Sequence, residues 1–191
     1  MNYLAHLYLA EDSPESIIGN LLGDFVKGTA IDHYSDGIKK GIEIHRKIDA
    51  FTDSHPDFIK SKRLISSINK RYAGIIVDIF YDHFLATKWL EYSSIPLKNF
   101  TSNVYKLLDD NEEILSGSLR AFLPRLKNEN LLMSYASIQG TSTALKRVSL
   151  RLKRENSLGK AVEDLNAQYQ EFEFNFIKFF PQLVEYTKSL S

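Results

Sequence analysis

Apolar residues recur every three or four positions along most of the chain, which is the spacing of an α-helix. The first segment of this kind begins at Ser13 and Pro14, which are usual residues just before and at the start of a helix. Leu21 and Phe25 continue the helical spacing, and Gly28 is a typical terminating residue. The pattern therefore predicts a helix that ends close to this glycine.

Later segments repeat the helical pattern. It predicts helices over residues 37–53, 57–70, 73–92 and 141–155, two or three shorter helices between residues 97 and 140, and a long final helix over residues 158–183. Pro124 is expected to kink or split one of the shorter helices. No stretch alternates polar and apolar residues for long enough to predict a sheet, and no linker or repeat divides the chain. We therefore expect an all-α helical bundle in which residues 1–191 form one domain.

Composition narrows the classes of protein that fit this bundle. Lys+Arg and Asp+Glu number 24 each, so the chain lacks the net positive charge typical of proteins that coat nucleic acid or membranes. It contains no cysteine, which excludes disulfides, thiol nucleophiles and cysteine metal sites. No apolar run reaches the roughly 20 residues of a membrane span, and the first residues do not resemble a signal peptide. We expect a soluble cytoplasmic protein that binds neither nucleic acid nor membranes.

Ionisable side chains interrupt the apolar faces of the predicted helices. They lie within or beside strongly apolar segments, at His6, Asp24, His45, Asp49, Asp78, Asp82 and His83. Burying several carboxylates without a partner would cost several kcal/mol each, so a positive charge should accompany them. A buried network with Arg46 is one interpretation. A metal ion is the other, and it also accounts for the histidines.

The spacing of these residues favours the metal. His45 and Asp49 are one helical turn apart and can reach one ion, and Asp78 and Asp82 have the same relation on a second helix. The predicted ligands converge on one cavity and are His6, Asp24, His45, Asp49, Asp82 and His83. Imidazole and carboxylate ligands without thiolate suit Mn²⁺, Fe²⁺, Mg²⁺ or Zn²⁺.

No motif of another catalytic class competes with this prediction. The chain has no nucleophile elbow, no phosphate-binding Walker loop and no dinucleotide-binding glycine motif. Gly19 and Gly23 stand one turn apart within the first predicted helix, and we interpret them as positions where two helices approach closely.

Four segments resemble the bacterial acyl carrier protein phosphodiesterase family. They are residues 1–7 (MNYLAHL), 19–26 (GNLLGDFV), 41–56 (GIEIHRKIDAFTDSHP) and 78–85 (DIFYDHFL). The third segment is long and distinctive, whereas the second half of the chain resembles the family only in general character.

The resemblance implies a helical protein distantly related to HD-type phosphohydrolases. Such an enzyme would hydrolyse the phosphodiester that joins 4′-phosphopantetheine to a serine of acyl carrier protein, releasing the apo carrier protein and free 4′-phosphopantetheine. The family is associated with Mn²⁺, and Asp24 matches its catalytically required aspartate. The chain has no His-Asp doublet of the HD type, only Asp82-His83 in the reverse order.

Catalytic roles follow from the chemistry of a phosphodiester anion. A carboxylate that does not bind metal, Asp24 or Asp53, is expected to take the proton of the attacking water. Arg46 is expected to hold the phosphate, although a structural ion pair would explain this residue equally well.

A basic segment supplies a candidate docking face. Residues 146–160 contain six basic residues and one acid, and Arg147, Arg151 and Arg154 share one face of the predicted helix 141–155. An acidic carrier protein would dock there by electrostatic attraction. Alternatively this is a solvated face that the acids of the following helix balance.

Two rival functions use the same residues differently. A nucleotide phosphohydrolase of the HD type would share the metal but would not need the basic face. A bundle that binds carrier protein without catalysis would have structural histidines and no metal.

Overall fold

The computed structural model describes residues 1–190, and every regular element within them is a helix. The α-helices are α1 (Tyr3–Leu9), α2 (Pro14–Leu22), α3 (Asp36–Ser54), α4 (Pro56–Leu64), α5 (Ala73–Thr87), α6 (Trp89–Tyr92), α7 (Leu97–Asp110), α8 (Gly117–Asn128), α9 (Leu131–Ser134), α10 (Ile138–Arg151), α11 (Val162–Ala167) and α12 (Tyr169–Lys188). Short 3₁₀ turns cover Gly28–Ile31, Lys70–Tyr72, Glu112–Ile114 and Leu158–Lys160. The all-α fold class expected from the sequence is confirmed.

Several helix boundaries differ from the predicted ones. Helix α2 is capped by Ser13, as expected, but ends at Leu22 rather than near residue 28. The predicted helix 57–70 ends at Leu64, and the predicted helix 73–92 divides into α5 and α6. The predicted final helix divides at Gln168 into α11 and α12.

Two further differences concern helices α1 and α10. Helix α1 carries His6 and was not assigned to any element from the sequence. Helix α10 begins at Ile138 and stops at Arg151, four residues before the predicted end. The Asn156 side chain stabilises this stop, because its amide donates to the Ser149 carbonyl (3.2 Å) and its Oδ1 accepts from the Ser149 hydroxyl (2.8 Å).

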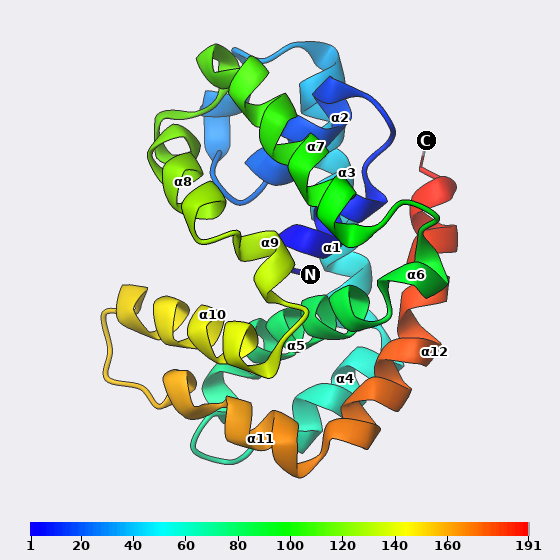
Figure 1. Ribbon diagram of the computed structural model, residues 1–191, viewed down its shortest axis with the longest axis vertical. Coiled ribbons are helices and arrows are strands. Elements are labelled where there is room, and N and C mark those ends of the chain that lie inside the picture. The colour runs from blue at the N-terminus through cyan, green and yellow to red at the C-terminus, as the bar shows by residue number, and fades with distance from the viewer. Residues whose placement is uncertain (191) are drawn as a thin grey trace.

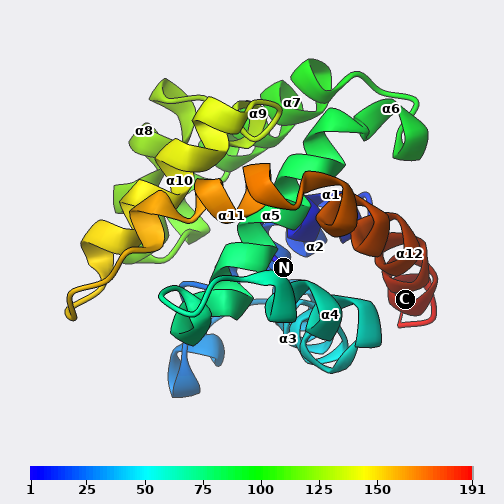
Figure 2. The same ribbon diagram turned by 90° about the horizontal axis from the view of Figure 1, so that it is seen from below.

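Helix α5 lies at the centre of the molecule, as its apolar sequence predicted (Figure 1). It packs against α1, α4, α10 and α12, and α12 runs along α4 and also contacts α3 (Figures 1 and 2). The aromatic residues Phe80 and Phe84 of α5 are fully buried against Phe172 and Phe176 of α12. This core fixes α5, whose carboxylates Asp78 and Asp82 face the N-terminal segment.

Helices α2 and α3 approach each other closely at glycine positions. A Cβ atom on Gly19 would lie 2.4 Å from the Ile38 carbonyl oxygen and 2.8 Å from the Cα of Gly41. The interpretation of Gly19 as a close-approach residue is therefore confirmed. No helix among residues 1–190 is long and apolar enough to cross a bilayer.

Candidate metal centre

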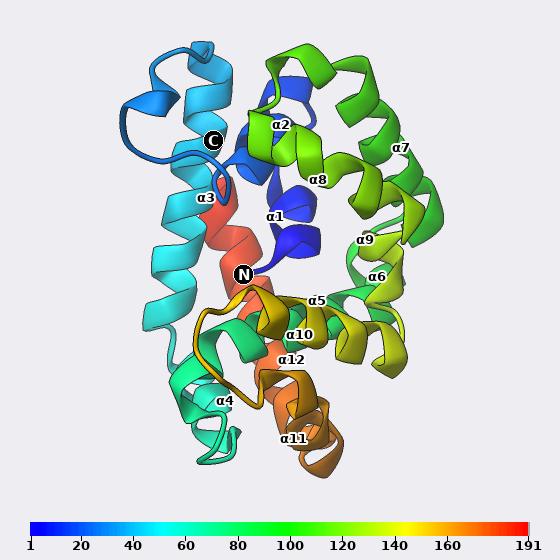
Figure 3. The same cartoon turned by 90° about the vertical axis from the view of Figure 1, so that its left-hand side faces the viewer.

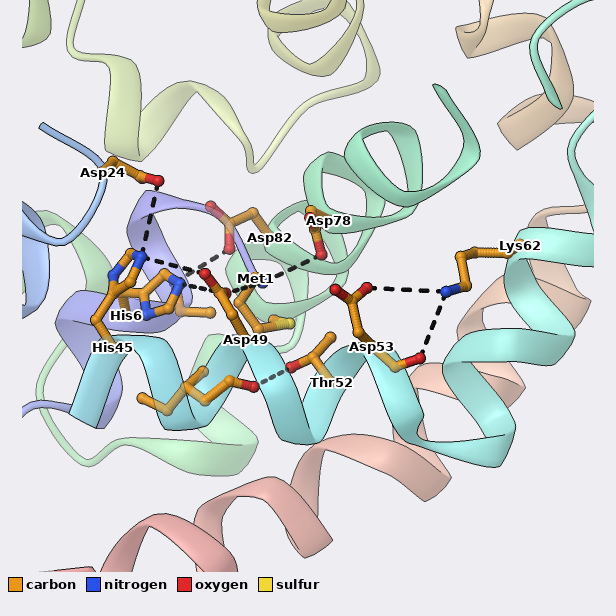
Figure 4. Close-up of polar contacts among 12 residues, drawn as sticks. Met1, His6, Asp24, His45, Asp49, Thr52, Asp53, Lys62, Asp78 and Asp82 are labelled. Atoms are coloured by element: carbon orange, nitrogen blue, oxygen red, sulfur yellow. Dashed lines mark hydrogen bonds and ion pairs between the residues drawn. The ribbon is translucent and has the colours of Figure 1, made fainter. Parts of the chain in front are cut away.

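His6 from α1 and His45 and Asp49 from α3 meet at one point (Figure 4). One ligand atom from each of the three lies within 4.8 Å of the others. Asp49 accounts for the arrangement, since its Oδ1 lies 3.2 Å from His6 Nε2 and its Oδ2 lies 3.2 Å from His45 Nε2. The two imidazole rings stack, with centroids 3.7 Å apart.

A hydrogen bond to the backbone fixes which ring nitrogen of His45 faces the neighbouring carboxylates. Its Nδ1 lies 2.7 Å from the Asn20 carbonyl, which can only accept, so Nδ1 carries the proton. Its Nε2 then faces carboxylate oxygens of Asp49 and Asp24 at 3.2 and 3.7 Å. Two electron-rich groups at this separation need a proton or a metal ion between them. A backbone carbonyl on the non-ligating nitrogen is also the usual arrangement of a metal-binding histidine.

Gly23 makes room for this ring. A Cβ atom there would lie 2.3 Å from His45 Cγ, closer than any ordinary carbon contact. Gly23 was expected to allow two helices to approach each other. Its missing side chain leaves the space that the His45 ring of α3 occupies.

His6 is a neutral imidazole at physiological pH. Burial, together with the charge of His45, lowers its pKa to about 3. Its Nδ1 is buried without a hydrogen-bond partner, whereas Nε2 faces Asp49. A neutral imidazole that keeps its proton on Nδ1 presents an unprotonated Nε2, which is the form that can bind metal beside Asp49.

Asp49 carries a stable negative charge. Burial opposes its ionisation, but contacts with His45 and His6 and the nearby positive charges hold its pKa well below the ordinary range. The amino group of Met1 lies 3.0 Å from Asp49 Oδ1 and 3.2 Å from Asp78 Oδ1. Burial opposes the charge on this amino group, yet the two carboxylates raise its pKa to about 11. A backbone amine has no side-chain pattern, so sequence reasoning did not find it.

Asp82 holds α1 rather than facing the centre. Its two carboxylate oxygens accept hydrogen bonds from the backbone N–H groups of Leu4 (2.9 Å) and Ala5 (3.0 Å). Burial raises the Asp82 pKa to about 7. This carboxylate therefore caps the first turn of the helix that carries His6.

His83 is not brought to the cluster. Its Nδ1 lies 2.7 Å from the Tyr135 carbonyl and its Nε2 lies 3.0 Å from the Tyr169 hydroxyl. Both ring nitrogens are thus engaged in contacts with other parts of the core. The expected convergence of six ligands is reduced to His6, His45 and Asp49, with Asp24 beside them.

The three catalytic candidates lie at different distances from the centre. Asp24 follows α2, its side chain is 43% exposed, and its Oδ1 is 3.7 Å from His45 Nε2. Burial and the Asp49 charge raise the Asp24 pKa. Asp53 is 74% exposed and lies 3.8 Å from Lys62 Nζ, away from the histidines (Figure 4). Arg46 is exposed on α3 and forms no ion pair within residues 1–190.

The three arginines of the predicted docking face do not share a helix face. Arg147 forms an ion pair with Glu129, and Arg151 lies over the Phe122 ring, 5.4 Å from its centroid. Arg154 follows the end of α10 and is exposed. The predicted shared face required a helix to residue 155, which the capping by Asn156 prevents.

The donor set fits a divalent metal. Two imidazoles and one ionised carboxylate converge, and Asp24 stands beside them as a further oxygen ligand or a base. Nitrogen and oxygen donors without sulfur are compatible with Mn²⁺, Fe²⁺ or Zn²⁺.

Comparison with known proteins gives one consistent result. The sequence profile of the acyl carrier protein phosphodiesterase family matches residues 1–183. Proteins of that name from Pectobacterium atrosepticum and Photorhabdus laumondii are 31% and 34% identical to this chain. The alignments cover 99% and 97% of the chain, and 98% and 94% of these relatives. No solved structure matches the chain.

Proposed function

Since the chain belongs to the acyl carrier protein phosphodiesterase family, whose members are hydrolases of a phosphodiester, we propose that it removes the prosthetic group of holo acyl carrier protein with the help of a divalent metal. The products would be apo carrier protein and free 4′-phosphopantetheine. Mn²⁺ is the first candidate metal, with Fe²⁺, Mg²⁺ and Zn²⁺ as alternatives.

One observation carries the metal dependence. His45 and His6 both direct Nε2 at the Asp49 carboxylate, the Asn20 carbonyl holds His45 Nδ1, and one ligand atom from each of the three residues lies within 4.8 Å of the others. We assign His6, His45 and Asp49 as the residues that hold the ion. A divalent ion bound there supplies positive charge for the phosphodiester and acidity for a water molecule.

Asp24 is the proposed general base. Its carboxylate is beside His45 but partly open to solvent, and its raised pKa makes it a better proton acceptor than an ordinary aspartate. It would take the proton of the attacking water while the oxygen of that water forms a bond to phosphorus. The bond from phosphorus to the serine oxygen would break, and the serine oxygen would take up the proton that Asp24 accepted, either directly or through a solvent water.

The remaining candidates receive other roles. Asp82 and His83 are proposed to position α1 and the core rather than to bind metal, because their polar atoms are already engaged. Asp53 and Arg46 are exposed on α3 and are not assigned to the reaction.

The function is tested by mass spectrometry of the carrier protein. Metal-free enzyme is incubated with holo acyl carrier protein, with and without added Mn²⁺, and the mass of the carrier protein is recorded. We expect loss of the 4′-phosphopantetheine mass only with metal. Asp24→Asn should abolish this conversion, whereas Asp53→Asn, the matched control on an exposed carboxylate, should retain it. An unchanged carrier protein together with hydrolysis of a nucleotide would replace the proposal with the nucleotide phosphohydrolase.

A further inference from the structure

Acidic side chains line the metal centre, and the ammonium group among them, that of Met1, is buried and already paired with Asp49 and Asp78. Asp24, Asp49 and Asp78 each keep part of their carboxylate exposed, with 43%, 42% and 25% of the side chain accessible. A phosphodiester carries a negative charge of its own, so it needs a positive contact in addition to the metal. Arg46, which the sequence suggested for this purpose, faces solvent.

An aromatic wall stands next to Asp24. Tyr3 precedes His6 by three residues on α1, so both side chains lie on the same face of that helix. The Tyr3 ring stacks on Phe25, the residue after Asp24, with centroids 6.2 Å apart and an interplanar angle of 19°. Phe122 of α8 closes the group, 5.6 Å from Tyr3 and 5.7 Å from Phe25.

Arg151 lies on this wall. The last residue of α10, it places its guanidinium 5.4 Å from the centre of the Phe122 ring. It also lines a hollow of about 50 Å³ together with Asn2, Tyr3 and Phe122. In Figure 3, α10 crosses in front of α5 just below the N-terminus, and side chains from both α10 and the N-terminal segment line the hollow.

The Tyr3 hydroxyl is influenced by both Arg151 and Asp24. Burial and the charge of Asp24 raise the Tyr3 pKa, while the charge of Arg151 and a hydrogen bond with it lower the pKa. Asp24 and Arg151 therefore both act on one phenol, in agreement with the ring contacts that join Arg151 to Phe122 and Phe122 to Phe25, the residue after Asp24. This neighbourhood was not evident from the sequence, in which the two residues are far apart.

Arg151 is exposed like Arg46, but it lies on the Phe122 ring and has no acidic partner in the part of the chain that the structure describes. Arg147, one turn earlier on the same helix, is neutralised by Glu129. Arg151 has no carboxylate within 4.0 Å in residues 1–190. A guanidinium presents a planar fork of N–H donors that suits two oxygens of a phosphate, and stacking on an aromatic ring holds it in place.

We propose that Arg151, held by Tyr3 and Phe122, binds the phosphodiester group of the substrate next to Asp24, rather than an acidic side chain on the surface of the carrier protein. The proposal rests on the phosphodiesterase function above. It reassigns one residue of the predicted docking face to the substrate-binding site and identifies the ligand as a phosphate oxyanion.

The test compares a large and a small substrate. Wild type, Arg151→Gln, Arg151→Lys and the exposed control Arg154→Gln are assayed with Mn²⁺ on holo acyl carrier protein and on bis(p-nitrophenyl) phosphate, a phosphodiester with no protein surface. Loss of a charged hydrogen bond to the phosphate should lower kcat/KM of Arg151→Gln by about 10- to 100-fold on both substrates. Arg151→Lys should recover part of the loss because it keeps the charge, and Arg154→Gln should stay within about twofold of wild type on the small substrate.

Binding of inorganic phosphate gives a second readout without turnover. Calorimetry on the Mn²⁺-loaded proteins should show weaker phosphate binding by Arg151→Gln, with an unchanged Mn²⁺ affinity and an unchanged circular dichroism spectrum. Loss of activity on the carrier protein alone would overturn the proposal and make Arg151 a docking residue. Wild-type activity of Arg151→Gln on both substrates would also overturn it. If the wild type hydrolyses neither substrate, the proposed function itself fails.

Discussion

Gly23→Ala tests the metal centre without altering any of its ligands. Gly23 has an ordinary helical conformation, with φ −50° and ψ −35°, so the backbone accepts alanine. The new Cβ would lie 2.3 Å from His45 Cγ, and carbon atoms in contact need about 3.5 Å, so the ring must move by roughly 1.2 Å. The ring has little freedom to move, because it is hydrogen-bonded to Asn20 and stacked on His6.

A displacement of this size should be visible in both binding and catalysis. A shift of about 1 Å in a catalytic group costs on the order of 100-fold in rate, and a disturbed ligand costs about 10- to 100-fold in metal affinity. The assays are Mn²⁺ titration by calorimetry and turnover of holo acyl carrier protein. Gly74→Ala in α5 is the matched control, since its Cβ would meet no atom within 4 Å. If Gly23→Ala binds Mn²⁺ and turns over like Gly74→Ala, the assignment of His45 as a ligand is refuted.

Three further predictions concern residues around the centre. Asp82→Ala leaves two buried N–H groups without acceptors and should lower the free energy of unfolding by about 2 to 4 kcal/mol at pH 5, measured by urea denaturation. The folded-state pKa of Asp82 is raised to about 7, so the stability that this group gives the wild type falls as pH rises from about 4 to 7. The difference in unfolding free energy between wild type and Asp82→Ala should therefore be smaller at pH 8 than at pH 5. A difference that stays constant with pH would contradict this prediction. His83→Gln should keep the wild-type Mn²⁺ affinity within about twofold, while His45→Gln should lose on the order of 100-fold, and equal losses would return His83 to the ligand set. Gly41→Ala should destabilise the fold in thermal melting, because its Cβ would lie 2.9 Å from the Cα of Gly19, and an unchanged Tm would contradict the close packing of α2 and α3.

Helical periodicity predicted the fold because most of the buried surface belongs to amphipathic helices. The prediction was least accurate where a side chain ends a helix. Asn156 ends α10 by donating a hydrogen bond to the Ser149 carbonyl. The spacing of apolar residues does not predict this contact. This missed helix end also explains the prediction for the three arginines. Their spacing would place them on one face of a continuous helix, but α10 ends at Arg151, before Arg154.

The candidate site was predictable where its ligands share a helix. His45 and Asp49 are one turn apart on α3, and the structure brings both to His6. Asp82 and His83 were expected to join them because they interrupt an apolar helix. An inward polar residue can equally cap a neighbouring helix or bond a buried carbonyl, and periodicity does not distinguish these uses.

Contacts between distant segments escaped sequence reasoning altogether. The Met1 amino group has no residue type to recognise, and the approach of Arg151 to Tyr3 depends on how α1 and α10 both pack against α5. Such contacts follow from the tertiary fold rather than from any local pattern.

The most direct test of the central claim is a crystal structure of the Mn²⁺-loaded protein with anomalous diffraction data. We expect one anomalous peak at about 2.0 to 2.3 Å from His6 Nε2, His45 Nε2 and an Asp49 carboxylate oxygen. His83 should remain bonded to the Tyr135 carbonyl. A protein that binds Mn²⁺ elsewhere, or that shows no peak at these three residues while it hydrolyses holo acyl carrier protein, would contradict the account.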